Sequence, residues 1–114
     1  MDKQVRKELL ENYKEREVIG GIYAIRNTLN NKLYVDDAVN LQGAKNRFDF
    51  ATETGTCIHL KLLDDWTEQS GSHFVFEVLE ELKKGSVQSA EEFKADVETL
   101  KEIWLEKLSD EHLY

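Results

Sequence analysis

The chain has 114 residues, of which 40% are apolar and 33% are charged. This length and balance fit one globular domain with a real core, and the chain is too short for two such domains. No apolar run approaches the length of a membrane span, and the N-terminus carries no apolar export segment, so we expect a soluble protein without membrane attachment. The single cysteine, Cys57, has no disulfide partner, which favours a reducing, cytoplasmic setting.

The chain is acidic: 23 acidic residues stand against 15 basic ones, for a net charge of −8. Nucleic-acid-binding proteins usually carry a basic face, because phosphate contacts drive their affinity. A local basic patch is available at most, and its candidate members are Arg26, Lys32, Lys45 and Arg47. The alternative is that these four side chains are scattered and solvated. The composition therefore argues against strong non-specific DNA binding.

An amphipathic helix is predicted near the N-terminus. Val5, Leu9 and Tyr13 recur at a spacing of four among charged residues, as expected for the apolar stripe of a helix. We interpret residues 1–19 as an extension that precedes a domain over residues 20–114.

A β-hairpin is predicted next, with strands over residues 21–26 and 32–36. Ile22 and Ala24 alternate with Tyr23 and Ile25 in the first segment, and Leu33 and Val35 alternate with Tyr34 in the second, which is the period of a pleated strand. Asn30-Asn31 between them can supply the positive φ angles of a tight turn. Each strand carries one tyrosine, Tyr23 and Tyr34, and cross-strand packing alone would explain such a pair.

Two helices are predicted after the hairpin. The first covers residues 41–51, with Asp37 or Asn40 as its N-cap. The second lies within residues 57–68 and is expected to bury three side chains together: Leu62, Leu63 and Trp66.

A strand and a long helix complete the chain. Residues 73–79 alternate as a third strand, and residues 89–109 repeat apolar positions at helical spacing. Ser89 and Glu92 match a capping box, and Trp104 is expected to anchor the helix in the core. The order α-β-β-α-α-β-α predicts an α+β domain whose small, three-stranded, mostly antiparallel sheet is packed by helices.

The hairpin resembles the opening of the GIY-YIG endonuclease superfamily. Gly21-Ile22-Tyr23 matches the first motif of that family in full, and residues 27–32 look like the hairpin of an intron-homing member. The similarity continues to about residue 108 in the same order of elements. The resemblance therefore implies a GIY-YIG-like fold over residues 20–108.

The resemblance also implies a chemistry. Members of this family hydrolyse one strand of a nucleic-acid backbone, such as DNA, with one divalent cation, Mg²⁺ or Mn²⁺. A first tyrosine, helped by a second, deprotonates and aims a water molecule. An arginine of the first helix stabilises the charge that develops at phosphorus, and a glutamate of the last helix holds the metal.

Three residues correspond to the family's catalytic set. Tyr23 matches the tyrosine of the first motif, and Tyr34 matches that of the second. His59 falls near a histidine that follows the first helix of the family. Surface or packing roles are the alternative for a lone histidine.

Three positions depart from the family pattern. The glycine that closes the second motif is Asp36, whose carboxylate would repel a phosphate. The arginine position, ten residues after Tyr34, is Ala44, and the glutamate position, three residues before Trp104, is Lys101. Loss of such an arginine alone costs roughly 10³–10⁵ in rate. The resemblance therefore predicts a catalytically impaired binding or interaction module without a cofactor, whose partner is weakly bound nucleic acid or a protein.

Two alternatives stay open. The first is a divergent Mg²⁺- or Mn²⁺-dependent DNA endonuclease, in which Arg47, on the same helical face as Ala44, replaces the missing arginine. Glu98 or Glu102 would then hold the metal, if the register of the last helix shifts. The second alternative is a protein-binding regulator with no nucleic-acid role.

Overall fold

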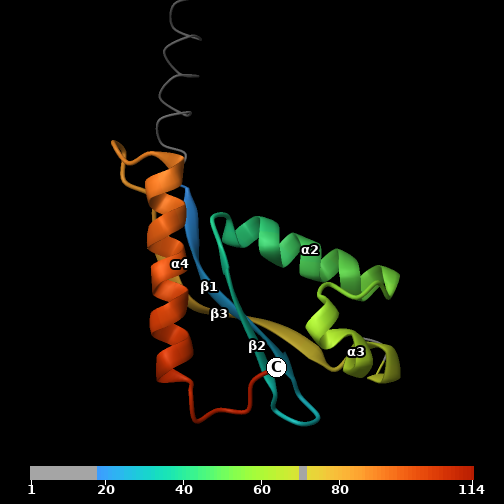
Figure 1. The fold of residues 1–114 in the computed structure, drawn as a ribbon. Helices are drawn as coiled ribbons and strands as arrows, with labels where there is room; N and C mark the ends of the chain where they lie inside the picture. The colour runs from blue at the N-terminus through green and yellow to red at the C-terminus, as the bar shows by residue number, and fades with distance from the viewer. Residues whose placement is uncertain (1–17, 70–71) are drawn as a thin grey trace, which may run out of the picture.

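A computed structural model describes residues 18–69 and 72–114 (Figure 1). The N-terminal helix predicted over residues 4–16 lies outside the described residues. The strands are β1 (Ile19–Asn27), β2 (Leu33–Ala38) and β3 (Phe74–Lys83). The helices are α2 (Leu41–Thr54), the 3₁₀ turn η1 (Leu60–Leu62), α3 (Leu63–Gln69) and α4 (Ala90–Lys107). The described order is therefore the predicted β-β-α-α-β-α. No helix among the described residues is long and apolar enough to cross a membrane.

The three strands form one antiparallel sheet in the order β2-β1-β3. Figure 1 shows α4 against one face of this sheet and α2 with α3 against the other. Ile22 and Ala24 of β1 pack in the α4 layer, whereas Tyr23 and Ile25 pack in the α2 layer. The alternation predicted for the first strand is thus confirmed, and each set of side chains has its own helical cover.

The predicted hairpin is confirmed, with strands slightly longer than the sequence pattern indicated. Asn31 has φ of 60°, and its N–H donates to the carbonyl of Asn27 over 2.7 Å. Asn27 is fully buried, and its Oδ1 accepts the N–H of Leu29 over 3.0 Å. The side chain of Asn30 accepts the N–H of Lys32 in the same way. Asparagine side chains therefore satisfy the turn's backbone as well as permitting its positive φ.

The first helix, α2, is capped by Asn40 rather than by Asp37, because Asn40 Oδ1 accepts the N–H of Gly43 over 3.0 Å.

The segment between α2 and β3 corrects one expectation, which concerns Leu63. Leu62 and Trp66 are buried as predicted, but the Leu63 side chain is 44% exposed. Leu62 closes a 3₁₀ turn and Leu63 begins α3, and adjacent helical positions point about 100° apart or more, so the two leucines cannot share one face.

The last two elements differ from prediction mainly in length. β3 runs to Lys83, and α4 begins at Ala90, directly after its N-cap Ser89, with the predicted Ser89–Glu92 capping box formed. Trp104 is only partly buried, and its indole N–H donates to Glu80 over 2.8 Å. The Trp104 ring packs against the core as predicted. Its indole N–H does not enter the core, because that group requires a hydrogen-bond partner.

Two adjacent glycines allow β1 to occupy the centre of the sheet. A Cβ atom on Gly21, where φ is +149°, would lie 2.0 Å from the Glu80 carbonyl oxygen. A Cβ atom on Gly20 would lie 2.5 Å from the Ala38 carbonyl oxygen. Both clashes involve backbone atoms of neighbouring strands, so side-chain movement cannot relieve them. The glycine of the first motif thus has a structural role of its own.

We expect Gly21→Ala to lower the free energy of unfolding by more than about 3 kcal/mol, from the backbone clash and the strained φ together. Chemical denaturation would measure it. Gly85→Ala is the matched control, because its added Cβ meets only ordinary contacts, and a change within about 0.5 kcal/mol is expected. Equal effects of the two substitutions would contradict the account.

Candidate functional site

The two tyrosines lie on the same face of adjacent strands. In the β1–β2 register Tyr23 is opposite Asp36, and Tyr34 is opposite Ile25. Both tyrosines are buried, with 7% of each residue exposed. Tyr34 donates its hydroxyl hydrogen to Asp36 Oδ2 over 2.7 Å, while the Tyr23 hydroxyl lies at a longer 3.5 Å from the same atom. The hairpin therefore brings both hydroxyls to one carboxylate.

Asp36 is the centre of this cluster. Its second oxygen, Oδ1, accepts the N–H of Asp37 over 2.8 Å and an N–H of the Lys101 ammonium over 3.1 Å. Burial alone would raise the pKa of Asp36, but the hydrogen bonds from Tyr34, the Asp37 backbone and Lys101 outweigh it and lower the pKa. Asp36 is therefore held as an anion with its acceptor positions in use.

The same environment opposes ionisation of the tyrosines. Burial and the negative charge of Asp36 raise the pKa of Tyr23 to about 12, although the positive charge of Arg47 acts in the opposite direction. Burial and the hydrogen bond to Asp36 also raise the pKa of Tyr34. Both hydroxyls are therefore hydrogen-bond donors at neutral pH.

Aromatic packing fixes the two rings. Tyr23 stacks on Phe76 of β3 with ring centroids 4.9 Å apart, and Tyr34 stacks on His59 at 4.6 Å. His59 also accepts the backbone N–H of Lys61 at Nδ1 and so caps the turn η1. The structure thus brings His59 into contact with the tyrosine pair, as a packing partner of Tyr34.

A cavity of about 300 Å³ opens beside Tyr34 and Asp36. Lys61 and Lys101 line it from η1 and α4. Tyr114 lines it from the C-terminal segment, which is bound to the edge of β2 through the Tyr114 N–H and the Leu33 carbonyl over 2.8 Å. Sequence reasoning missed this contribution, because no local pattern in residues 109–114 indicates pairing with a strand 80 residues earlier.

The remaining candidates lie around this cluster rather than within it. Ala44 is 1% exposed and packs in the α2 layer of the core. Arg47 lines a neighbouring hollow with Asp37 and is close enough for its charge to affect Tyr23. Glu98 raises the pKa of Asp37 through its charge, after burial and the charge of Asp36.

The residues present do not fit the metal site that the resemblance implies. Among the described residues, no three side chains of His, Cys, Asp or Glu are grouped to hold a metal ion. In the described part of the chain, neither Glu98 nor Glu102 forms a hydrogen bond with Tyr23, Tyr34 or Asp36. The position where a glutamate ligand would stand is Lys101, and its ammonium is bound to Asp36.

The candidate basic patch is not a free cationic surface. Arg26 forms an ion pair with Glu77 over 2.8 Å, and Lys45 forms one with its helix neighbour Asp49 over 3.1 Å. Lys32 lies over the ring of Tyr114. Arg47 lines a hollow with Asp37 and Lys94 that none of these three residues lines, so the alternative of scattered charges describes the molecule better.

Two solved structures are similar to this chain. One is a Glu-to-Ala mutant of the catalytic domain of intron endonuclease I-TevI, at 28% identity and a TM-score of 0.59 over 80% of this chain and 84% of that one. The other is the catalytic domain of homing endonuclease I-TevI, at 28% identity and a TM-score of 0.59 over 82% of this chain and 96% of that one. No protein-family model matches the chain, and no curated protein matches it.

The fold and the tyrosine hairpin define an endonuclease-like domain. More particularly, the structural neighbours and the Gly21-Ile22-Tyr23 strand place the chain in the GIY-YIG endonuclease superfamily.

Removing the charge of Asp36 should lower the pKa of Tyr23 from about 12 towards 10, with burial keeping it above the ordinary value. The pKa would be measured by following tyrosinate absorbance against pH in the parent and in the Asp36→Asn variant. In each case the signal of Tyr23 is the part that the additional Tyr23→Phe substitution removes. Arg47→Ala should move the pKa of Tyr23 upwards, because Arg47 lowers it. An unchanged pKa in Asp36→Asn would contradict the assigned role of Asp36.

Asp36 should also make stability depend on pH. Its folded-state pKa is below the ordinary value of 3.8, so its stabilisation is present above about pH 4 and is lost as the pH falls through the lowered pKa. Asp36→Asn should cost about 1–2 kcal/mol near pH 6 and little once Asp36 is protonated, as measured by urea denaturation across pH. Asp49→Asn, which breaks an exposed helical ion pair, should cost less than about 0.5 kcal/mol. A pH-independent cost of Asp36→Asn would refute this.

Proposed function

We propose that this GIY-YIG domain is catalytically impaired and acts as a binding module. The observation that carries the proposal is the Asp36–Lys101 ion pair. Its carboxylate accepts the Tyr34 hydroxyl at the place where the nuclease chemistry of the family would occur. The proposal goes beyond the family assignment: the similar structures have the same fold and are named as endonucleases, so the fold alone does not imply catalytic impairment.

The first argument concerns the general base. A tyrosine that accepts a proton from water must be ionised, or must pass its own proton to a neighbour. With a pKa of about 12, only about one Tyr23 in 10⁵ is ionised at pH 7. Asp36 is a poor acceptor for that proton, because its own pKa is lowered. The cluster is therefore stable as a hydrogen-bonded unit and unsuited to proton abstraction.

The second argument concerns charge. Phosphodiester hydrolysis builds negative charge at phosphorus, and the loss of one donor to such charge costs roughly 10²–10³ in rate. Asp36 and Asp37 place two carboxylates next to the tyrosines, and both would repel the substrate. Lys101 offsets one of them but is occupied by that interaction.

Nicking of supercoiled plasmid DNA in the presence of Mg²⁺ or Mn²⁺ tests the proposal. We expect the natural chain and its Tyr23→Phe variant to show the same background, because Tyr23 does not activate water. The two proteins would be purified in parallel, so that a contaminating nuclease appears equally in both. Metal-dependent nicking that disappears with Tyr23→Phe would overturn the proposal.

A divergent endonuclease is the second candidate, and one observation favours it. Arg47 is near enough to Tyr23 to lower its pKa, which is the direction that catalysis would need. This candidate predicts that Arg47→Ala abolishes nicking, as does either Glu98→Gln or Glu102→Gln. Activity that survives all three substitutions would exclude this arrangement of residues.

A role confined to protein partners is the third candidate. The net charge of −8 and the pairing of Arg26 and Lys45 favour it. It differs from a nucleic-acid-binding role in DNA affinity at low salt, where phosphate contacts are strongest. Undetectable DNA binding under those conditions would leave protein partners as the ligands of the module.

A further inference from the structure

We propose that the groove between the edge strand β3 and helix α2 binds an extended peptide segment of a partner protein. The peptide would add a strand to β3, place one apolar side chain in the pocket between β3 and α2, and place a lysine or arginine beside Glu81. The inference rests on the binding role proposed above and names the class of partner. Strand addition with side-chain pockets is a recurrent mode of peptide recognition.

The backbone of β3 offers the first part of this site. Among the described residues, β3 pairs with β1 alone and forms one edge of the sheet. From Phe74 to Val78 the pairing is regular, opposite Asn27 to Tyr23. Alternate residues of an edge strand direct their N–H and C=O groups away from the sheet, so this segment can pair with an added strand.

A bulge shapes the strand next to the pocket. Ile22 pairs with Glu80 and Tyr23 with Val78, so Leu79 has no opposite residue. Val78 lines the pocket on the α2 side and Leu79 packs with the α4 layer, as in a regular strand. Beyond the bulge, Glu80 remains on the α4 side, where it accepts from Trp104, and Glu81 comes to line the pocket. Bulges at sheet edges commonly redirect side chains in this way.

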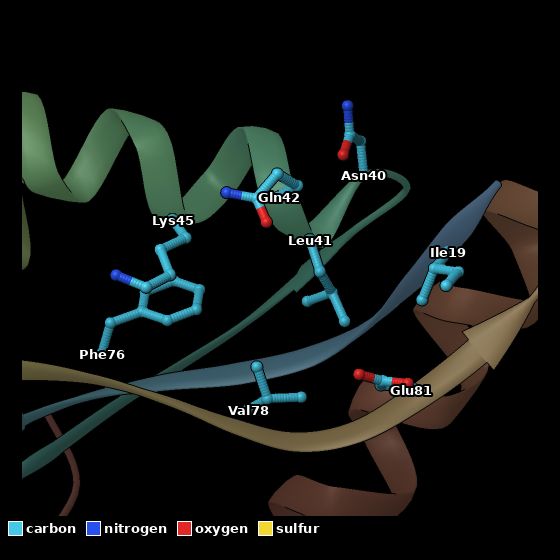
Figure 2. A pocket seen from close by; sticks show the side chains of 8 residues that line it. All are labelled: Ile19, Asn40, Leu41, Gln42, Lys45, Phe76, Val78 and Glu81. Atoms are coloured by element: carbon cyan, nitrogen blue, oxygen red, sulfur yellow. The ribbon is translucent and has the colours of Figure 1, made fainter. Parts of the chain in front are cut away.

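The pocket itself has a volume of about 280 Å³ and an apolar floor. Figure 2 shows Val78 and Phe76 of β3 below Gln42 and Lys45 of α2, with Leu41 projecting between the helix and the sheet. The apolar floor suits one large apolar side chain, with the Gln42 amide at the rim of the pocket.

The charge at the rim selects the partner. Two carboxylates of β3 are already engaged, Glu77 by Arg26 and Glu80 by the Trp104 indole. Glu81 lines the pocket and forms no ion pair with any residue of the described part of the chain. A basic side chain next to the apolar one would meet Glu81, whereas a nucleic-acid backbone would be repelled.

The test uses the full isotope-labelled chain and one synthetic heptapeptide, Lys-Val-Thr-Leu-Thr-Val-Lys, followed by NMR up to millimolar concentration. Saturable shifts are expected at the amides of Val75, Glu77 and Gln42, with α4 unaffected. The same peptide with alternate amides N-methylated cannot form the ladder and should cause no such shifts. Absence of saturable shifts, or shifts centred on α4, would overturn the inference.

Substitutions with matched controls localise the binding. Val78→Asp should weaken peptide binding at least about tenfold, because it buries a carboxylate in the apolar pocket. Val87→Asp is its control, since Val87 is 98% exposed and lies outside the groove, and it should have no effect. Equal weakening by both would count against the groove.

The charge preference has its own pair of variants. Glu81→Lys should reverse the preference towards a peptide with glutamate at both ends, while Glu106→Lys on α4 should not. An unaltered preference in Glu81→Lys would remove Glu81 from the site. These results are independent of nicking: DNA cleavage that depends on Tyr23 would overturn the proposed function alone, and a failed peptide titration would overturn this inference alone.

Discussion

The close approach of three backbones at Gly20 and Gly21 is the constraint on which the rest of the structure depends. β1 is the central strand, and both helical layers pack against side chains that alternate along it. Any side chain at these glycines would collide with carbonyl groups of β2 or β3. Once the strands are close, Tyr23 is opposite Asp36 and the face that carries both tyrosines is defined. The first motif of the family is thus a packing requirement before it is a catalytic one.

The tyrosine site differs from the pattern of the GIY-YIG family in the placement of its charges. A carboxylate lies on β2, where the family has glycine, and an ammonium lies on α4, where the family has a carboxylate. These two changes compensate each other, because Asp36 and Lys101 form an ion pair across the site. Each substitution alone would leave an unpaired, partly buried charge, which is costly. Their joint presence gives a stable cluster whose hydrogen bonds are satisfied internally.

The peptide groove and the tyrosine cluster are linked by β3. Phe76 stacks on Tyr23 and also lines the pocket next to α2. A segment bound along β3 would therefore contact the outer side of the same aromatic packing that holds the tyrosines. Binding at the sheet edge is independent of catalysis, because strand addition needs backbone groups and a pocket rather than reactive side chains.

The sequence by itself determined the local structure. Period-2 alternation identified the hairpin, and Asn30-Asn31 and the Ser89–Glu92 capping box marked a turn and a helix start, since each of these signals depends on neighbours a few residues apart. Spacing also identified Asp36 and Lys101 as departures from the family. Only the tertiary structure decided that these two residues bind each other, that Leu63 faces solvent, and that Tyr114 walls the cavity beside Tyr34. These three features depend on how the sheet and the helices pack, which brings together residues that are far apart in the chain. No short pattern of residues carries a signal for such packing.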